Sequence, residues 1–213
     1  MKYPDYKTYE KQYKRFFKKG VNYLLEKTDI KKTDRCIDIC GGGGRLTVEL
    51  TKLSDNVTYL DQEKDMIPPF LKDLGVEVIN SSVQGFLTHY NGPKFDKAFC
   101  EQAINYWFNY ISPMKLAELF NPGGVFVFNT FSQKPSAKPT VREEDVDGLH
   151  YVEVNTLVND SKVNHVQFCE GMEPHFTVFD WIPEATFRER LDPYFDIELY
   201  DNGKSAIYVC HKK

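Results

Sequence analysis

The sequence lacks the features that mark several specialised protein classes. It has no apolar run long enough to cross a membrane, no signal-peptide pattern at its start and no internal repeat, so we expect a cytoplasmic protein. It also has no excess of basic residues, because 31 acidic residues outnumber 27 basic ones and leave a net charge of −4. This balance argues against nucleic acid as the main partner, and no membrane partner is expected.

Cysteine is scarce and scattered. The chain has five, an odd number, and Cys36 and Cys40 have no second pair at zinc-ligand spacing. We therefore reject a metal site. The other three are Cys100, Cys169 and Cys210, and most of the five lie in strand-like runs, which favours small core residues in a reducing compartment.

Two common phosphate-binding glycine patterns are also missing. The chain has neither the Gly-x-Gly-x-x-Gly of dinucleotide sites nor a Gly-Lys-Ser/Thr, which argues against a nucleotide-dependent oxidoreductase. What is present is a short apolar run at residues 36–40, four consecutive glycines at 41–44, and leucines at helical spacing over 46–53. This order predicts a buried strand, a tight turn and a helix whose N-terminus favours an anionic group.

The rest of the chain alternates strand and helix patterns. We predict strands at 56–60, 76–80, 95–101 and 125–131, helices at 112–120 and 183–191, and a closing hairpin of 195–201 and 206–211 through Asn202-Gly203. Residues 133–147 are polar and are expected to form an exposed loop. Residues 151–158 and 162–169 predict a hairpin, to which 176–181 adds a third strand.

Two stretches resemble a known family. The run from Asp38 through Cys40 to Gly44 resembles motif I of the class I S-adenosylmethionine-dependent methyltransferases, Asp-x-Gly-x-Gly-x-Gly, with Cys40 where the first glycine stands. Residues 119–128 are similar to the family's Leu-x-Pro-Gly-Gly before an apolar strand. The resemblance implies an α/β fold: a seven-stranded, mostly parallel, doubly wound sheet with an antiparallel last strand. It implies one domain, 1–213, with an N-terminal helical cap (1–30) and an antiparallel β insertion (142–181).

The resemblance also implies S-adenosyl-L-methionine as cofactor and names the residues around it. Asp61 follows the second strand, where the family's acid holds the ribose, and Met66 stands where an apolar residue packs on adenine. Ser82 occupies the place of the family's adenine-binding Asp. The implied cofactor-binding residues are Tyr13, Asp38, Cys40, Gly41, Gly42, Gly44, Asp61, Gln62, Met66, Ser82, Val83 and Glu101.

The first segment, residues 3–25, has tyrosines and phenylalanines at three- and four-residue steps with lysines between them. This pattern predicts a helix, either packed on the core or closing the cofactor cleft as a lid. In the resembled family a tyrosine of such a lid contacts the cofactor, and Tyr9 and Tyr13 are the candidates here.

The acceptor is less defined by the sequence. The Asn/Asp-Pro-Pro-aromatic motif of methyltransferases that act on amide or adenine nitrogens is missing after the fourth strand, where Gln102, Tyr106 and Trp107 stand as candidate pocket residues. A hydroxyl acceptor needs a general base, for which histidine suits neutral pH. We favour His175 over His150 and His165, with Asp180 and Glu101 as further alternatives.

These features favour methyl transfer to an oxygen or nitrogen of a small molecule, such as a metabolite, a sugar or a natural-product intermediate. Two alternatives stay open. One is an RNA or protein methyltransferase that docks its substrate on the lysine-rich first helix. The other is a non-catalytic S-adenosylmethionine-binding subunit that uses its β insertion as a partner interface. The insertion is also the candidate contact for a homodimer.

Overall fold

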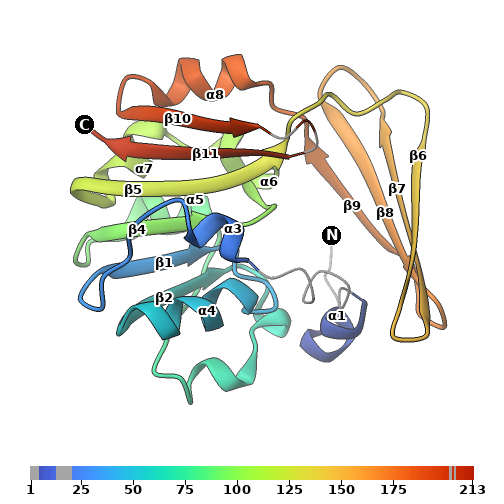
Figure 1. The fold of residues 1–213 in the computed structure, drawn as a ribbon, viewed down its shortest axis with the longest axis horizontal. Coiled ribbons are helices and arrows are strands. Elements are labelled where there is room, and N and C mark those ends of the chain that lie inside the picture. The colour runs from blue at the N-terminus through green and yellow to red at the C-terminus, as the bar shows by residue number, and fades with distance from the viewer. Residues whose placement is uncertain (1–4, 13–20, 202, 204) are drawn as a thin grey trace.

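The computed structural model describes residues 5–12, 21–201, 203 and 205–213. Two sheets organise the chain, one on each side of Figure 1. The larger has seven strands in the order β10-β11-β5-β4-β1-β2-β3, and the smaller has four in the order β6-β7-β8-β9. No helix in the described ranges is long and apolar enough to cross a membrane.

The seven-stranded sheet is built as expected. Its parallel strands are β1 (Arg35–Ile39), β2 (Asn56–Asp61), β3 (Glu77–Asn80), β4 (Phe95–Cys100) and β5 (Phe120–Phe131). The last hairpin, β10 (Phe195–Asp201) and β11 (Ser205–Lys212), adds the antiparallel strand β11 beside β5. The predicted fold class is therefore confirmed.

Helices cover both faces of this sheet (Figure 1). One face holds α3 (Asn22–Leu25) and α4 (Arg45–Leu53); the other holds α5 (Val83–His89), α6 (Ile104–Trp107), α7 (Pro113–Glu118) and α8 (Glu184–Leu191). Short 3-10 turns are η1 (Lys64–Met66), η2 (Pro69–Leu71) and η3 (Phe108–Tyr110). Alternate β5 residues face opposite ways, since Val125 and Val127 pack with Leu46 while Phe126 and Phe128 pack on the other side.

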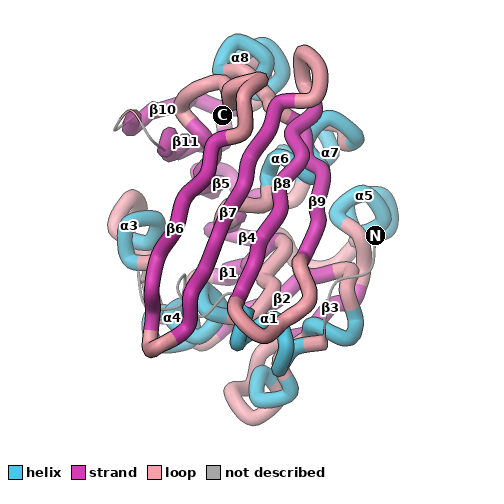
Figure 2. Tube along the Cα trace, turned by 90° about the vertical axis from the view of Figure 1, so that its right-hand side faces the viewer, coloured by secondary structure: helices cyan, strands magenta, loops and turns pink. Residues whose placement is uncertain are grey.

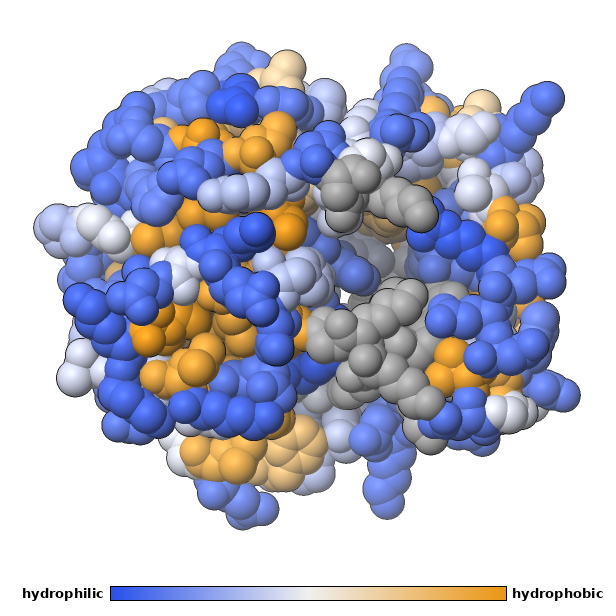
Figure 3. Space-filling model, viewed as in Figure 1, coloured by the Kyte–Doolittle hydropathy of each residue, from blue (hydrophilic) through white to orange (hydrophobic). Residues whose placement is uncertain are grey.

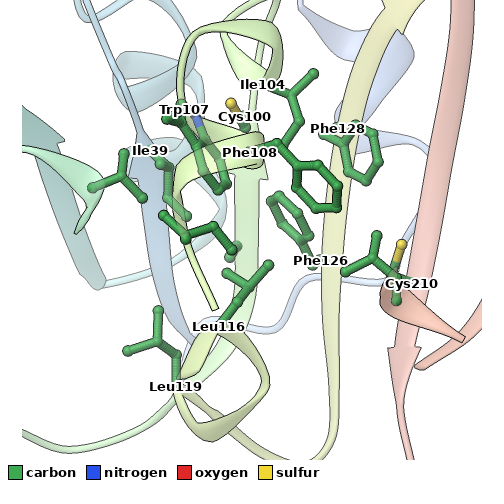
Figure 4. Packing of buried hydrophobic residues seen from close by; sticks show 14 of the residues in the cluster. Ile39, Cys100, Ile104, Trp107, Phe108, Leu116, Leu119, Phe126, Phe128 and Cys210 are labelled. Carbon is green, nitrogen blue, oxygen red and sulfur yellow. The ribbon is translucent and has the colours of Figure 1, made fainter. Parts of the chain in front are cut away.

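The second face holds the larger core, part of which is drawn in Figure 4. At its centre Phe187 of α8 lies 5.1 Å from the ring of Phe128 and 4.8 Å from the ring of Phe108. The Tyr208 ring stacks on Phe128 at 4.7 Å. These rings anchor the hairpin β10–β11 and helix α8 to the parallel strands.

Some element boundaries differ from the predictions. The described part of the first segment contains α1 (Tyr6–Gln12) and then α3, and Val21 before α3 has a non-helical φ of −121° and ψ of 3°. The single helix predicted for residues 3–25 is therefore wrong. Strand β5 begins at Phe120, and a register shift against β4 accommodates the Pro-Gly-Gly turn.

The insertion is larger than the predicted three strands. Its strands are β6 (Thr140–Val146), β7 (Leu149–Leu157), β8 (Lys162–Cys169) and β9 (His175–Asp180), all antiparallel. The loop predicted at 133–147 is wrong over β6, because these residues pair with β7 in an antiparallel hairpin. Asp147 and Gly148 form its tight turn, with positive φ angles of 53° and 75°. Charged residues on β6 concealed the strand from the pattern.

The small sheet carries polar and apolar residues on both of its faces. Its face toward the large sheet buries Glu153, Asn155 and Gln167, whereas its outer face exposes 53% of Val141 and 59% of Phe176. Val141, Val154, Val166 and Phe176 pair in register from strand to strand and form one apolar row. Figure 2 looks onto this outer face, and Figure 3 shows hydrophobic side chains at the surface on its right-hand side.

The aromatic core gives a direct test of the fold. Because Phe187 is fully buried among rings, we expect Phe187→Ala to lower the free energy of unfolding by about 3–5 kcal/mol in urea titrations. Met114→Ala is the control, since Met114 is exposed and its loss should cost less than about 1 kcal/mol. Equal costs for both variants would contradict this description of the core.

Candidate active site

The glycine turn lies at the carboxyl end of β1, beside the end of β2. Asp61, the last residue of β2, accepts a hydrogen bond from the Gly42 amide at 2.9 Å and another from the Glu63 amide at 2.9 Å. Its carboxylate is buried, and burial raises its pKa, while the amide hydrogen bonds act in the opposite direction. The carboxylate is thus held in place at the edge of the sheet.

Close packing explains the glycine at position 41. A Cβ there would overlap the ring of Tyr59, which is fully buried and donates its hydroxyl to the Gly42 carbonyl at 2.8 Å. Gly42 has a φ of 49°, and Cys40, at the family's first glycine position, has a φ of 61°. The turn therefore keeps its left-handed geometry at Cys40 even though a side chain makes that conformation costly.

Asp38 lies in β1, just before the glycine turn. It is buried in β1 and accepts a hydrogen bond from the Thr47 hydroxyl at 2.6 Å, which joins the strand to α4. Burial raises the pKa of Asp38 to about 7, and the charges of Glu101 and Asp61 act in the same direction.

An ion pair lies at the carboxyl end of β4, the strand next to β1 on the side away from β2. Glu101 follows β4 and forms an ion pair with Arg45 at the start of α4. The Tyr23 hydroxyl also donates to Glu101 at 2.9 Å, and the Asn129 amide donates to Tyr23 at 3.3 Å. Both charges of the pair are mostly buried, so each depends on the other for stability.

A cavity of about 690 Å³ runs along this edge. One wall is the glycine turn with Asp61 and Met66, and the opposite wall is the polar face of the small sheet. Tyr9 of α1 lies over the turn, because a Cβ on Gly42 would come within 3.3 Å of its hydroxyl. Helix α1 also contacts the small sheet, since the Tyr151 hydroxyl donates to the Lys11 carbonyl at 2.9 Å.

Most of the residues named from the sequence line this cavity. Those implied for the cofactor and found in its walls are Asp38, Cys40, Gly41, Gly42, Asp61, Gln62, Met66, Ser82, Val83 and Glu101. The predicted pocket residues Gln102, Tyr106 and Trp107 line it as well. Gly44 instead forms the N-cap of α4 with a φ of 73°, and Tyr13 lies outside the described residues.

His175 is not among the lining residues. It is buried on β9, and burial, with the nearby charge of His165, lowers its pKa to about 4. His165 on β8 lines the cavity, together with Glu153, Gln167 and Arg142. In the sequence, polar residues on β7 and β8 alternate with Val152, Val154 and Val166. Alternation shows which residues share a face, but it does not show which face meets the cavity.

Comparison with solved structures identifies the architecture. A structure of an S-adenosylmethionine-dependent methyltransferase from Clostridium acetobutylicum matches 98% of this chain and 92% of its own, with a TM-score of 0.65 and 17% identity. The fold is that of the class I S-adenosylmethionine-dependent methyltransferases. No family model matches the sequence, and no curated protein matches it either.

Two further methyltransferase structures show the same likeness. The amino pentose methyltransferase CalS10 from Micromonospora echinaspora was solved with S-adenosylmethionine bound; it matches with a TM-score of 0.63 and 13% identity over 84% of each chain. The sugar N-methyltransferase KedS8 from a Streptoalloteichus species matches 98% of this chain and 88% of its own, with a TM-score of 0.62 and 12% identity. All three proteins share their fold with this chain, although their sequence identity to it is low.

The buried Asp38 carboxyl makes stability depend on pH. Its folded-state pKa of about 7 lies above the unfolded value, so its contribution is complete in acid and is lost as pH rises toward and through 7. We therefore expect Asp38→Asn to gain stability relative to wild type between pH 5 and pH 8, by up to about 3 kcal/mol in urea titrations. The matched control is Asp55→Asn, because Asp55 is exposed; a pH-independent difference for Asp38→Asn would contradict the assignment.

Proposed function

We propose that this protein is an S-adenosylmethionine-dependent methyltransferase whose acceptor is a small molecule. The observation that carries the proposal is the shared cavity: the glycine turn and Asp61 form one wall, and the buried polar face of the small sheet forms the other. The fold and the hydrogen-bond-accepting Asp61 carboxylate at the sheet edge both support a cofactor of this kind.

The residues present fit the parts of the cofactor. Asp61 can accept hydrogen bonds from vicinal ribose hydroxyls, and Met66 and Val83 offer apolar contact for a flat base. Glu101 and Arg45 present opposite charges that match the ammonium and carboxylate groups of an amino acid. S-adenosylmethionine supplies a methyl group on a positively charged sulfur.

The chain then has to hold an acceptor in line with that methyl group and exclude water. Orientation of this kind contributes up to roughly 7–11 kcal/mol in favourable cases. Tyr106 and Phe179 pack edge to face at 5.8 Å on the acceptor side of the cavity, and Phe131 stacks on Phe179 at 5.4 Å. These rings lie beside the buried polar groups of the small sheet, which roofs the cavity, and they suit a ring-shaped acceptor with hydroxyl or amino groups; we propose that the transfer is to oxygen or nitrogen.

Calorimetry with S-adenosylmethionine and S-adenosylhomocysteine tests the cofactor assignment. We expect both to bind to the wild-type protein and Asp61→Ala to weaken each by about 10- to 100-fold, because hydrogen bonds to a carboxylate are lost. Asp65→Ala is the control, since Asp65 is exposed in η1 near the same turn. No binding by the wild type would overturn the proposal, and equal affinities for the two variants would remove Asp61 from the site.

We propose further that a second copy of this chain covers the apolar row on the outer face of the small sheet. The whole outer face around this row, four strands of about eight residues, presents roughly 500 Å² per copy, so two such faces reach about 1,000 Å² in total, which is near the lower limit for a specific interface. A twofold axis lets the same row meet itself.

Sedimentation tests this contact. We expect a dimer for the wild type and a monomer for Phe176→Asp, because a buried carboxylate without a partner charge opposes association. Tyr200→Asp is the control, since Tyr200 is similarly exposed but lies on β10 of the large sheet. A wild-type monomer at micromolar concentration would contradict the proposal.

A further inference from the structure

Three polar side chains form a connected chain on the inner face of the small sheet. Asn155 of β7 donates its amide nitrogen to the Glu153 carboxylate at 2.7 Å. The Asn155 amide oxygen lies 2.9 Å from Nδ1 of His165 on the neighbouring strand β8. Asn155 and His165 are direct partners in the register of the two strands, so the backbone holds this contact.

The direction of the hydrogen bonds follows from the carboxylate. An ionised Glu153 only accepts, so Asn155 must turn its NH₂ group to Glu153 and its oxygen to His165. An amide oxygen also only accepts, so Nδ1 of His165 carries the hydrogen. The neutral ring therefore has its lone pair on Nε2, the nitrogen on the opposite side of the ring from Asn155.

His165 also reaches the cavity in which the acceptor is proposed to bind. It lines the same cavity as the glycine turn, and its ring centroid lies 6.2 Å from that of Phe179 on the neighbouring strand β9. The Glu153 carboxylate is 4.0 Å from Nδ1, close enough to stabilise a positive charge on the ring.

The groups that face His165 come from each neighbouring element. Glu153 faces it from β7, and Arg142 of β6 pairs in register with Glu153. On β9, Thr177 is its register partner and accepts the Tyr106 hydroxyl of α6 at 3.2 Å, and His175 is close enough for the charge of His165 to lower its pKa. Glu153 is the one carboxylate among these named groups, and it favours the protonated ring.

We propose that His165 is the general base for the acceptor and that Asn155 and Glu153 are its positioning residues. The inference rests on the proposed methyl transfer. A lone pair of the acceptor oxygen or nitrogen forms the new bond to the methyl carbon, and the carbon–sulfur bond breaks with its electrons passing to sulfur. The acceptor proton passes to Nε2 of His165, which becomes an imidazolium next to Glu153, and solvent later removes it. This places the base on β8 rather than at His175.

Nitrogen-15 NMR of histidine-labelled protein tests the relay without any acceptor. We expect neutral His165, assigned by the loss of its signals in His165→Gln, to carry its hydrogen on Nδ1. Asn155→Leu removes the accepting oxygen and should reduce the ratio of the Nδ1–H to the Nε2–H form by about fivefold or more. An Nε2–H form in the wild type, or an unchanged ratio in Asn155→Leu, would overturn the proposal.

Glu153→Gln separates the charge from the geometry. Its amide oxygen can still accept from Asn155, so the tautomer should persist, while loss of the negative charge should lower the pKa of His165 by about one unit. His150 is the internal reference, because its Nδ1 contacts Asp145 at 2.8 Å on the exposed end of the sheet and neither variant touches it. An unchanged pKa of His165 in Glu153→Gln would remove Glu153 from the relay.

Two controls keep this test distinct from that of the proposed function. Each variant is first titrated with S-adenosylmethionine by calorimetry, and an affinity equal to wild type shows that the fold is retained. If the wild type itself fails to bind, the proposed function fails whatever the tautomer is. Once an acceptor is found by screening hydroxylated and aminated sugars, His165→Gln should lower kcat by about 100-fold or more. In Glu153→Gln, the acidic limb of the kcat–pH profile should move to lower pH by the same amount as the pKa of His165.

Discussion

The hydrogen bond from the Gly42 amide to the Asp61 carboxylate is the contact on which the rest of this site depends. It links the turn after β1 to the end of β2, two neighbouring parallel strands whose carboxyl ends meet at one edge. A buried carboxylate is costly unless amides compensate it, and here two backbone N–H groups do so. This carboxylate therefore fixes the turn at Gly42 against the end of β2, where both line the cavity.

The opposite wall follows a different logic. The inner face of the small sheet buries Glu153, Asn155 and Gln167 beside apolar residues such as Val163 and Phe179, while its outer face carries an exposed apolar row. Burial of polar groups is stable when they bond to one another, as Asn155 does with Glu153 and His165. As a result, the small sheet lines the cavity with hydrogen-bond donors and acceptors.

The sequence allowed the large sheet to be predicted well. Its strands are short apolar runs ended by glycine, proline or asparagine turns, and residues at the ends of parallel strands fall at one edge wherever the helices pack. Asp61 and Glu101 could therefore be placed beside the glycine turn from their positions alone, and both line the cavity.

The small sheet could not be predicted in the same way. Strand β6 is rich in charge and was interpreted as a loop, and alternation on β7 and β8 shows which residues share a face but not which face meets the cavity. The choice between His165 and His175 depended on that packing: both lie on the inner face, but His175 is buried away from the cavity lining. Only tertiary contacts distinguish them.

The small sheet is one continuous stretch of chain between β5 and α8, so it enters and leaves the large sheet at a single place. Changes within this stretch can alter the size and polarity of the roof while the aromatic core under Phe187 and the bond at Asp61 stay the same. Evolution can therefore revise the chemistry of the roof in small steps without rebuilding the scaffold. This modularity offers a physical reason why one architecture persists among chains that share only 12–17% of their residues with this one.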